Sequence, residues 1–250
     1  MSLFMHVTYI LSGLLGGFLI GLTGVGGGSL MTPLLVLGFG IPLETAIGTD
    51  LLFASLTKAQ GVWSYHRKKL IRWNLVRHLL IGSLPMATLA LIVGYQLPHG
   101  LLNTYLPTIL ASALILTAIA LLIPPPKAVT PCQPRYIKWA GAFIGCIASL
   151  SSVGAGALGT ALLWRLEPQL KFAEIVATEL AHAVPFTFIA GLTQSLLGKV
   201  DFVLLLQLVI GSWIGIRWGI KLNSYVPDHV AKPILAGLLV LLSLGFLHHH

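Results

Sequence analysis

The chain has 250 residues, of which 56% are hydrophobic and 9% are charged, and its mean hydropathy is +0.91. An average soluble domain carries about 25% charged residues, so this composition excludes a soluble globular protein and is typical of a polytopic membrane protein in a lipid bilayer. The formal net charge of +8 does not indicate a nucleic-acid partner, because the basic residues lie between apolar segments and form no soluble patch.

The first predicted element is a helical pair over residues 3–38 that glycines interrupt. The interruption, GLTGVGGGSLMTPLL at residues 21–35, combines five glycines with two threonines and a proline. Three fuller spans follow at residues 43–64, 73–96 and 101–123, because about 20 apolar residues at 1.5 Å per residue cross a bilayer core of about 30 Å. No segment alternates apolar and polar residues as lipid-spanning strands do, so we predict an all-α protein.

A proline-rich linker and a second set of elements complete the chain. The stretch IPPPKAVTPCQPRYIKW cannot be helical through its prolines, and we assign residues 124–136 to a cytoplasmic linker. The second set consists of an interrupted pair and three spans, at residues 137–166, 171–196, 200–220 and 230–247. Residues 248–250 are histidines and resemble the remains of an expression tag.

The two halves of the chain repeat each other. At an offset of 128 or 129 residues, the aligned pairs include Gly13 with Gly141, Gly26 with Gly154, Gly28 with Gly156, Thr32 with Thr160, Thr49 with Thr178 and Asp50 with Glu179. Duplication on this scale is a fold-level signal. We therefore predict two transmembrane repeats, residues 1–123 and 137–247, each made of a glycine-broken short-helix pair plus three transmembrane helices.

The basic residues predict how the repeats are oriented. Lys and Arg are retained on the cytoplasmic side, and the loop near residue 68 is rich in them, whereas its counterpart near Lys199 is not. Placing the first loop inside puts 13 of the 15 basic residues on that side, with Lys199 outside and Lys58 within a span. The repeats are then inverted and both termini lie outside. The alternative is two parallel four-span repeats, each with a continuous broken first helix.

The two glycine-rich breaks predict a binding site at mid-membrane. Paired broken helices in inverted repeats are a recurring transporter architecture that works by alternating access, with one repeat rocking against the other. Helix starts near Gly28 and Gly156 present free N–H groups and positive dipole ends, which favour a small anion. The alternative is that the glycines only allow close helix packing. The predicted substrate-binding residues are Gly24, Gly26, Gly27, Gly28, Ser29, Thr32, Thr49, Ser152, Gly154, Gly156 and Thr178.

Four ionisable residues within the predicted spans are candidates for coupling transport to an ion gradient: Asp50, Lys58, Glu179 and His182. Such residues are costly in a membrane, so their default explanation is functional. Asp50 and Glu179 occupy equivalent positions and could carry protons or a cation; the alternative is that each caps its helix at the membrane edge. Lys58 could neutralise Asp50 or attract the anion, although snorkelling toward the loop near residue 66 is favoured. For His182, a hydrogen bond to its own helix is favoured.

Two other classes of function are less well supported by the residues. Glu179 and His182 are three residues apart on one helix face and, with Asp50 opposite, would suit a divalent metal transporter. A metal site usually needs more ligands than these, so we expect none. No nucleophile is paired with a base at convincing spacing and no metal-hydrolase motif occurs, so we expect neither an enzyme nor a cofactor.

The motifs together resemble those of the TauE/SafE family of membrane anion exporters. They are GVGGGSLMTPLL at residues 24–35 and AIGTD at residues 46–50, with the echoes SVGAGALGTALL and VATEL in the second half. The resemblance covers residues 10–245. It implies movement of sulfite, sulfonates or related sulfur oxyanions and organic acids across the bacterial inner membrane. The residues leave open whether the protein is a monomer or a homodimer. The acids at positions 50 and 179, where the family more often has a small polar residue, imply different coupling or selectivity.

Overall fold

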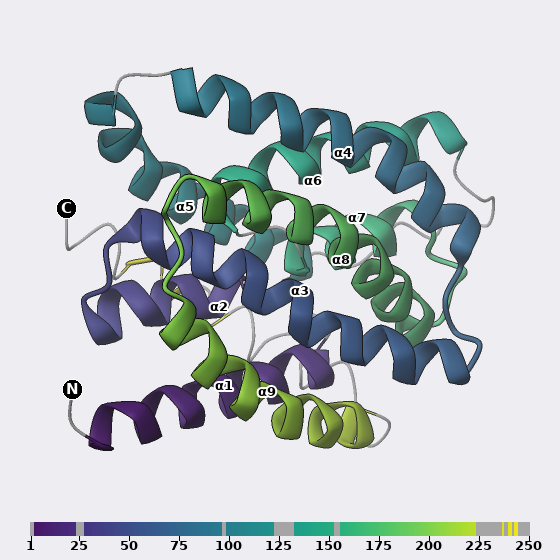
Figure 1. The fold of residues 1–250 in the computed structure, drawn as a ribbon. Coiled ribbons are helices and arrows are strands. Elements are labelled where there is room, and N and C mark those ends of the chain that lie inside the picture. The colour runs from purple at the N-terminus through teal and green to yellow at the C-terminus, as the bar shows by residue number, and fades with distance from the viewer. Residues whose placement is uncertain are drawn as a thin grey trace.

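The computed structural model describes residues 3–23, 28–96, 99–122, 133–152 and 156–223, together with 237, 240, 241, 243 and 244. In this part of the chain all regular structure is helical, which confirms the all-α class (Figure 1). The elements are α1 (Leu3–Thr23), α2 (Gly28–Pro33), η1 (Leu34–Gly38), α3 (Leu43–Arg67), α4 (Trp73–Gln96), α5 (His99–Leu122), α6 (Pro134–Ser151), α7 (Ala157–Leu166), α8 (Phe172–Leu196) and α9 (Phe202–Asn223). The prediction of a span at 230–247 and that of a tag remnant lie almost wholly outside the described residues.

Most helix boundaries fall close to the predicted ones, and the clearest difference is at α6. This helix begins at Pro134, inside the stretch that we assigned to the linker. The helix therefore starts three residues before the predicted residue 137. Proline is compatible with the first position of a helix, because the N–H group that it lacks would have no intrahelical partner there.

Among the described residues, four helices are long and apolar enough to cross a membrane: Met5–Leu22, Trp73–Gly94, Phe172–Leu196 and Phe202–Leu222. They are not equally covered by protein. In α8, 72% of the apolar window is buried, against 33% in α1 and in α4. The fold therefore has a protein-covered centre, and α1 and α4 present apolar side chains outward, as lipid-facing helices do.

The covered centre consists of α3 and α8, which run antiparallel (Figure 1). The amino end of α3 lies at the carboxyl end of α8, where the Thr49 hydroxyl oxygen accepts a hydrogen bond from the Asp201 backbone N–H at 3.0 Å. At the opposite end, the Thr178 hydroxyl oxygen accepts from the Arg72 N–H at 3.1 Å. Each central helix is thus fastened to the loop that follows the other.

Two parallel helix pairs flank this centre, α1 with α9 and α4 with α6 (Figure 1). Glycines let the backbones in each pair touch. A Cβ atom added at Gly13 would meet the Leu208 carbonyl, and one added at Gly141 would meet the Leu79 carbonyl. The two contacts are equivalent at the repeat offsets. Small residues at helix crossings are a common basis for close packing in membranes.

The first interrupted pair enters and leaves the fold at the same end. The ring of Tyr9, in the second turn of α1, lies 4.9 Å from the ring of Phe39, which directly follows η1. Gly40, with φ of +65°, allows the turn that leads from there into α3. α1 and the segment formed by α2 and η1 therefore run in opposite directions.

We expect the glycines at the helix crossings to be intolerant of even one added methyl group. Alanine at position 82 would collide with the Lys138 carbonyl and the Ala142 N–H of α6, so Gly82→Ala should destabilise the protein by roughly 1–3 kcal/mol. Gly94→Ala, on the same helix, meets only a Leu150 methyl group at 3.3 Å and should be neutral or stabilising. Thermal unfolding in detergent measures both, and equal melting temperatures would contradict the close crossing.

Candidate functional site

The polar centre of the molecule lies between α3 and α8. It consists of Asp50 and Lys58 on α3 and Glu179 and His182 on α8, hereafter the central cluster, and all four side chains are 0% exposed. These are the four residues that the sequence predicted as coupling residues. Charged side chains are rarely buried unless they are paired. Their partners therefore define what the cluster can do.

Asp50 joins the two glycine-rich breaks. Its Oδ2 accepts hydrogen bonds from the Thr32 hydroxyl, on α2, at 2.6 Å and from the Ser152 hydroxyl, at the end of α6, at 2.9 Å. Ser152 caps α6 in the left-handed conformation, with φ of 59°. The helix-capping explanation of Asp50 is wrong, since α3 begins at Leu43 with Pro42 at its N-cap and Asp50 lies two turns inside.

Glu179 is held by a histidine and a serine. His182 Nδ1 lies 3.2 Å from Glu179 Oε2, and His182 Nε2 lies 2.9 Å from the Ser83 hydroxyl on α4. The Glu179 carboxyl also packs against the backbone of α7 at Gly159, where no Cβ would fit. His182 was expected to bond to its own helix; it does so through Glu179 and in addition reaches α4.

Lys58 points into the centre of the protein. Its side chain is 0% exposed, and its Nζ finds no hydrogen-bond partner among the described residues. The ammonium group interacts electrostatically with both Glu179 and Asp50. The snorkelling prediction was therefore wrong, because the attraction of two buried carboxylates outweighs the pull of the water near residue 66.

The repeat-equivalent positions around the cluster carry different side chains. Thr160 is the counterpart of Thr32, but its hydroxyl and Glu179 Oε1 have no hydrogen-bond partner within the described part of the chain. Phe53 is the counterpart of His182, and Met31 that of Gly159. Glu179 and His182 on α8 are thus matched on α3 by Asp50 and Phe53, so the imidazole has no counterpart there.

The other predicted binding residues are not all brought to the cluster. Thr49 and Thr178 instead accept hydrogen bonds from the backbone of the two loops. Gly28 and Ser29 open α2, and Gly156 is the buried N-cap of α7. Gly24, Gly26, Gly27 and Gly154 lie outside the described residues.

Ser83 is a site residue that the sequence reasoning missed. A single hydroxyl in an apolar span carries no local signal. The sequence signal that could have revealed Ser83 was its match with Ser212, within the repeated Ile-Gly-Ser stretches. Ser212 forms a corresponding contact, with its Oγ 2.7 Å from the Thr57 Oγ1.

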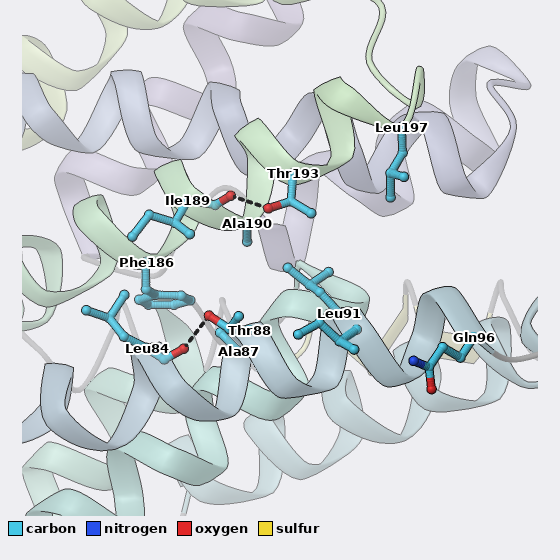
Figure 2. Close-up of a pocket in the computed structure, with 11 residues that line it drawn as sticks. Leu84, Ala87, Thr88, Leu91, Gln96, Phe186, Ile189, Ala190, Thr193 and Leu197 are labelled. Carbon is cyan, nitrogen blue, oxygen red and sulfur yellow. Dashed lines mark hydrogen bonds between the residues drawn. The ribbon is translucent and has the colours of Figure 1, made fainter.

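A groove of about 260 Å³ runs between α4 and α8 (Figure 2). Its walls are mostly apolar side chains, including Leu84, Leu91 and Phe186. The hydroxyls of Thr88 and Thr193 donate to carbonyls of their own helices, at 2.9 and 3.0 Å. The groove therefore has few free donors for an anion, and it is chemically unlike the hydroxyl-lined centre.

The family-model match decides what kind of protein this is. The model described as "Sulfite exporter TauE/SafE" matches residues 9–246, nearly the whole chain. The chain belongs to the TauE/SafE family. This confirms the resemblance found in the glycine-rich motifs.

Two Bacillus subtilis (strain 168) proteins are similar along their full lengths. "Probable membrane transporter protein YjnA" is 34% identical over 94% of this chain and 97% of its own length. "Probable membrane transporter protein YdhB" is 28% identical over 90% of this chain and 96% of its own. With the apolar helices, these findings establish a multi-pass membrane transporter of the TauE/SafE type.

The part of the chain that the structure describes gives no support to the divalent-metal alternative. Among the described residues, no group of three or more His, Cys, Asp or Glu side chains could hold a metal ion. Asp50, Glu179 and His182 are all described, so they do not converge as ligands. Both ring nitrogens of His182 are already engaged.

We expect the central cluster to depend on its charge balance. Lys58→Met leaves two buried carboxylates without their cation and should destabilise the protein by roughly 3–5 kcal/mol. Adding Glu179→Gln removes one of those charges and should restore part of the loss. Thermal unfolding of both variants tests this, with Lys68→Met in the exposed loop as the control. A double variant no more stable than Lys58→Met would contradict the pairing.

Proposed function

We propose that this TauE/SafE protein moves a small anion across the cytoplasmic membrane by alternating access. Sulfite, an organosulfonate or a related sulfur oxyanion or organic acid is the substrate class. One observation carries the proposal: hydroxyls from both glycine-rich breaks, Thr32 and Ser152, donate to the same carboxylate oxygen of Asp50. An oxyanion of the substrate would find donors from both halves of the chain converging on one point.

The helix starts at the breaks support the same site. α7 begins at Ala157, immediately after the buried N-cap Gly156, and α2 begins at Gly28. The first N–H groups of a helix have no intrahelical acceptor and carry the positive end of its dipole. The backbone N–H groups at the starts of α2 and α7 would therefore complete the shell of donors. The family description supplies the sulfur chemistry, and the residues supply the preference for an oxyanion.

We propose further that the two repeats are inverted in the membrane. The antiparallel run of α3 and α8, which are repeat equivalents, supports this, because copies related by an axis in the membrane plane run in opposite directions. The reciprocal contacts of Thr49 with Asp201 and of Thr178 with Arg72 support it as well. Parallel repeats would place the two loops on one side.

The basic residues support an inside position for the carboxyl end of α3. They gather at the helix ends that lie together there: Arg67, Lys68, Lys69, Arg72, Arg77, Arg135, Lys138, Arg165, Lys171, Arg217 and Lys221. Lys199 lies at the opposite end and is paired with Glu44 at 2.9 Å. By the positive-inside rule, the first end faces the cytoplasm of a bacterial-type inner membrane.

Thiol labelling tests the inverted arrangement. In a variant without Cys132 and Cys146, a cysteine replacing the exposed Leu196, at the carboxyl end of α8, should react with an impermeant reagent in intact cells. Lys68→Cys, in the loop after α3, should react only after the membrane is permeabilised. Equal labelling of both positions in intact cells would reject inversion.

The glycine crossings suggest which parts move during alternating access. We expected one repeat to rock against the other, but each crossing joins helices from both repeats, α1 to α9 and α4 to α6. Backbones in contact move together. We therefore propose that the two helix pairs tilt as units about α3 and α8, making and breaking the Thr32 and Ser152 bonds to Asp50.

Flux into proteoliposomes tests the transport proposal. The wild-type protein should move sulfite, isethionate or taurine saturably, with sulfate as a further comparison. Because a hydrogen bond to a charged group contributes roughly 1.5–3 kcal/mol, Thr32→Val and Ser152→Ala should each raise the half-saturating concentration about tenfold. Thr117→Val, which removes a hydroxyl bonded within α5, is the matched control. Absence of flux for all four compounds would reject the function.

A further inference from the structure

A hydrogen-bonded line of three side chains crosses from α8 to α4. It runs from Glu179 through His182 to Ser83, with contacts of 3.2 and 2.9 Å, and all three side chains are 0% exposed. While Glu179 is ionised, its carboxylate only accepts hydrogen bonds, so the Nδ1 of His182 must carry a proton. The chemistry of the line therefore depends on the other ring nitrogen, Nε2.

The partner of Nε2 suits both protonation states of the ring. When His182 is neutral, the Ser83 hydroxyl donates to the Nε2 lone pair. When His182 is protonated, Nε2–H donates to the Ser83 oxygen, because a hydroxyl both donates and accepts. Only the hydroxyl hydrogen has to rotate. A buried imidazole that remains hydrogen-bonded in both states is suited to take up and release a proton.

The ionisable groups around Glu179, His182 and Ser83 include one more negative charge than positive charges. Two carboxylates, Asp50 and Glu179, face one ammonium group, Lys58, and the ammonium interacts with both. The remaining elements around His182 contribute neutral groups, namely the Ser83 hydroxyl from α4 and the Gly159 backbone of α7 beside Glu179. With neutral His182, the central cluster carries one net negative charge in a buried setting, which is costly. A proton on His182 balances it.

The equivalent helix crossing of the other half cannot hold a proton in this way. The repeat counterpart of His182 is Phe53, which has no titratable group. Ser212, the counterpart of Ser83, contacts Thr57 and donates to the Val209 carbonyl at 3.0 Å. Among the described residues, the line with an imidazole thus occurs in one half. The ring of Phe186, which forms part of the groove wall (Figure 2), lies 5.0 Å from that of His182.

We propose that the coupling ion of this transporter is a proton, that His182 carries it, one per transport cycle, and that Glu179 and Ser83 position the ring. The proposal rests on the proposed anion transport and adds the identity of the ion and of its carrier. No bond other than those to the proton is made or broken. His182 takes a proton from water on one side of the membrane and releases it on the other.

The test uses proteoliposomes of the full chain and two radiolabelled anions, isethionate and sulfite. Exchange of labelled for unlabelled anion needs no gradient and reports transport alone. Accumulation driven by an imposed pH gradient reports coupling. Isethionate stays ionised across the usable pH range, so its pH response belongs to the protein. A trapped pH-sensitive dye counts protons in the wild-type protein, and we expect one per anion.

His182→Gln should retain measurable exchange but lose gradient-driven accumulation, which should fall to the level seen without a gradient. Ser83→Ala should shift the pH profile of exchange, and Ser83→Thr, which keeps the hydroxyl, should restore it. In Asp50→Asn, Glu179 and Lys58 balance each other without a proton on His182. This variant should therefore also lose gradient-driven accumulation. Ser212→Ala removes the equivalent hydroxyl in the other half and should leave both measurements unchanged.

The outcomes separate the two proposals. If the wild-type protein exchanges neither anion, the anion-transport proposal fails. If it exchanges them but moves no protons during net anion flux, or if His182→Gln retains gradient-driven accumulation, the proton proposal fails while anion transport stands. Should His182→Gln not fold, the dye count and the Ser83 series still decide the question.

Discussion

Burial of two carboxylates beside one lysine, between a pair of antiparallel helices, is the constraint on which the rest of the structure depends. Neither Asp50 nor Glu179 can reach water, so each must find donors inside the protein. Asp50 finds them on the two glycine-rich breaks, which draws the ends of the interrupted helices to the centre. Glu179 finds an imidazole. The flanking helices then cover these groups with apolar surface that suits lipid.

Features with a local cause could be predicted from the sequence. Residues 73–96 form a helix with the predicted bounds, and α2 and α7 start where the glycines end. Contacts between distant segments could not be predicted in the same way. The burial of Lys58 depends on Glu179, which lies on another helix, and the role of Thr49 depends on a loop in the other half. A hydroxyl or a lysine offers the same local pattern whether it meets water, a carboxylate or a backbone N–H.

Duplication preserved the backbone of the two halves more closely than their chemistry. The glycine contacts recur at equivalent positions, since any side chain there would push two helices apart. Residues that face the centre differ, with Met31 and Phe53 in one half and Gly159 and His182 in the other. Having Gly159 and His182 where the other half has Met31 and Phe53 leaves the helix crossings intact. A repeated framework can therefore acquire a single titratable group without giving up its packing.

The glycine crossings also bear on how such a protein could have arisen. Each joins one helix from either half, so a chain with a single repeat would have α1 and α4 but no partner for the glycine face of either. If the repeats are inverted, as proposed, that partner comes from a copy that lies in the bilayer in the opposite orientation. An ancestral half-length protein would therefore have had to insert in both orientations and assemble as an antiparallel pair. Fusion of two such genes would have fixed one orientation for each half. Lysines and arginines could then accumulate at the cytoplasmic end of each half, which gives the two matched loops their different numbers of basic residues.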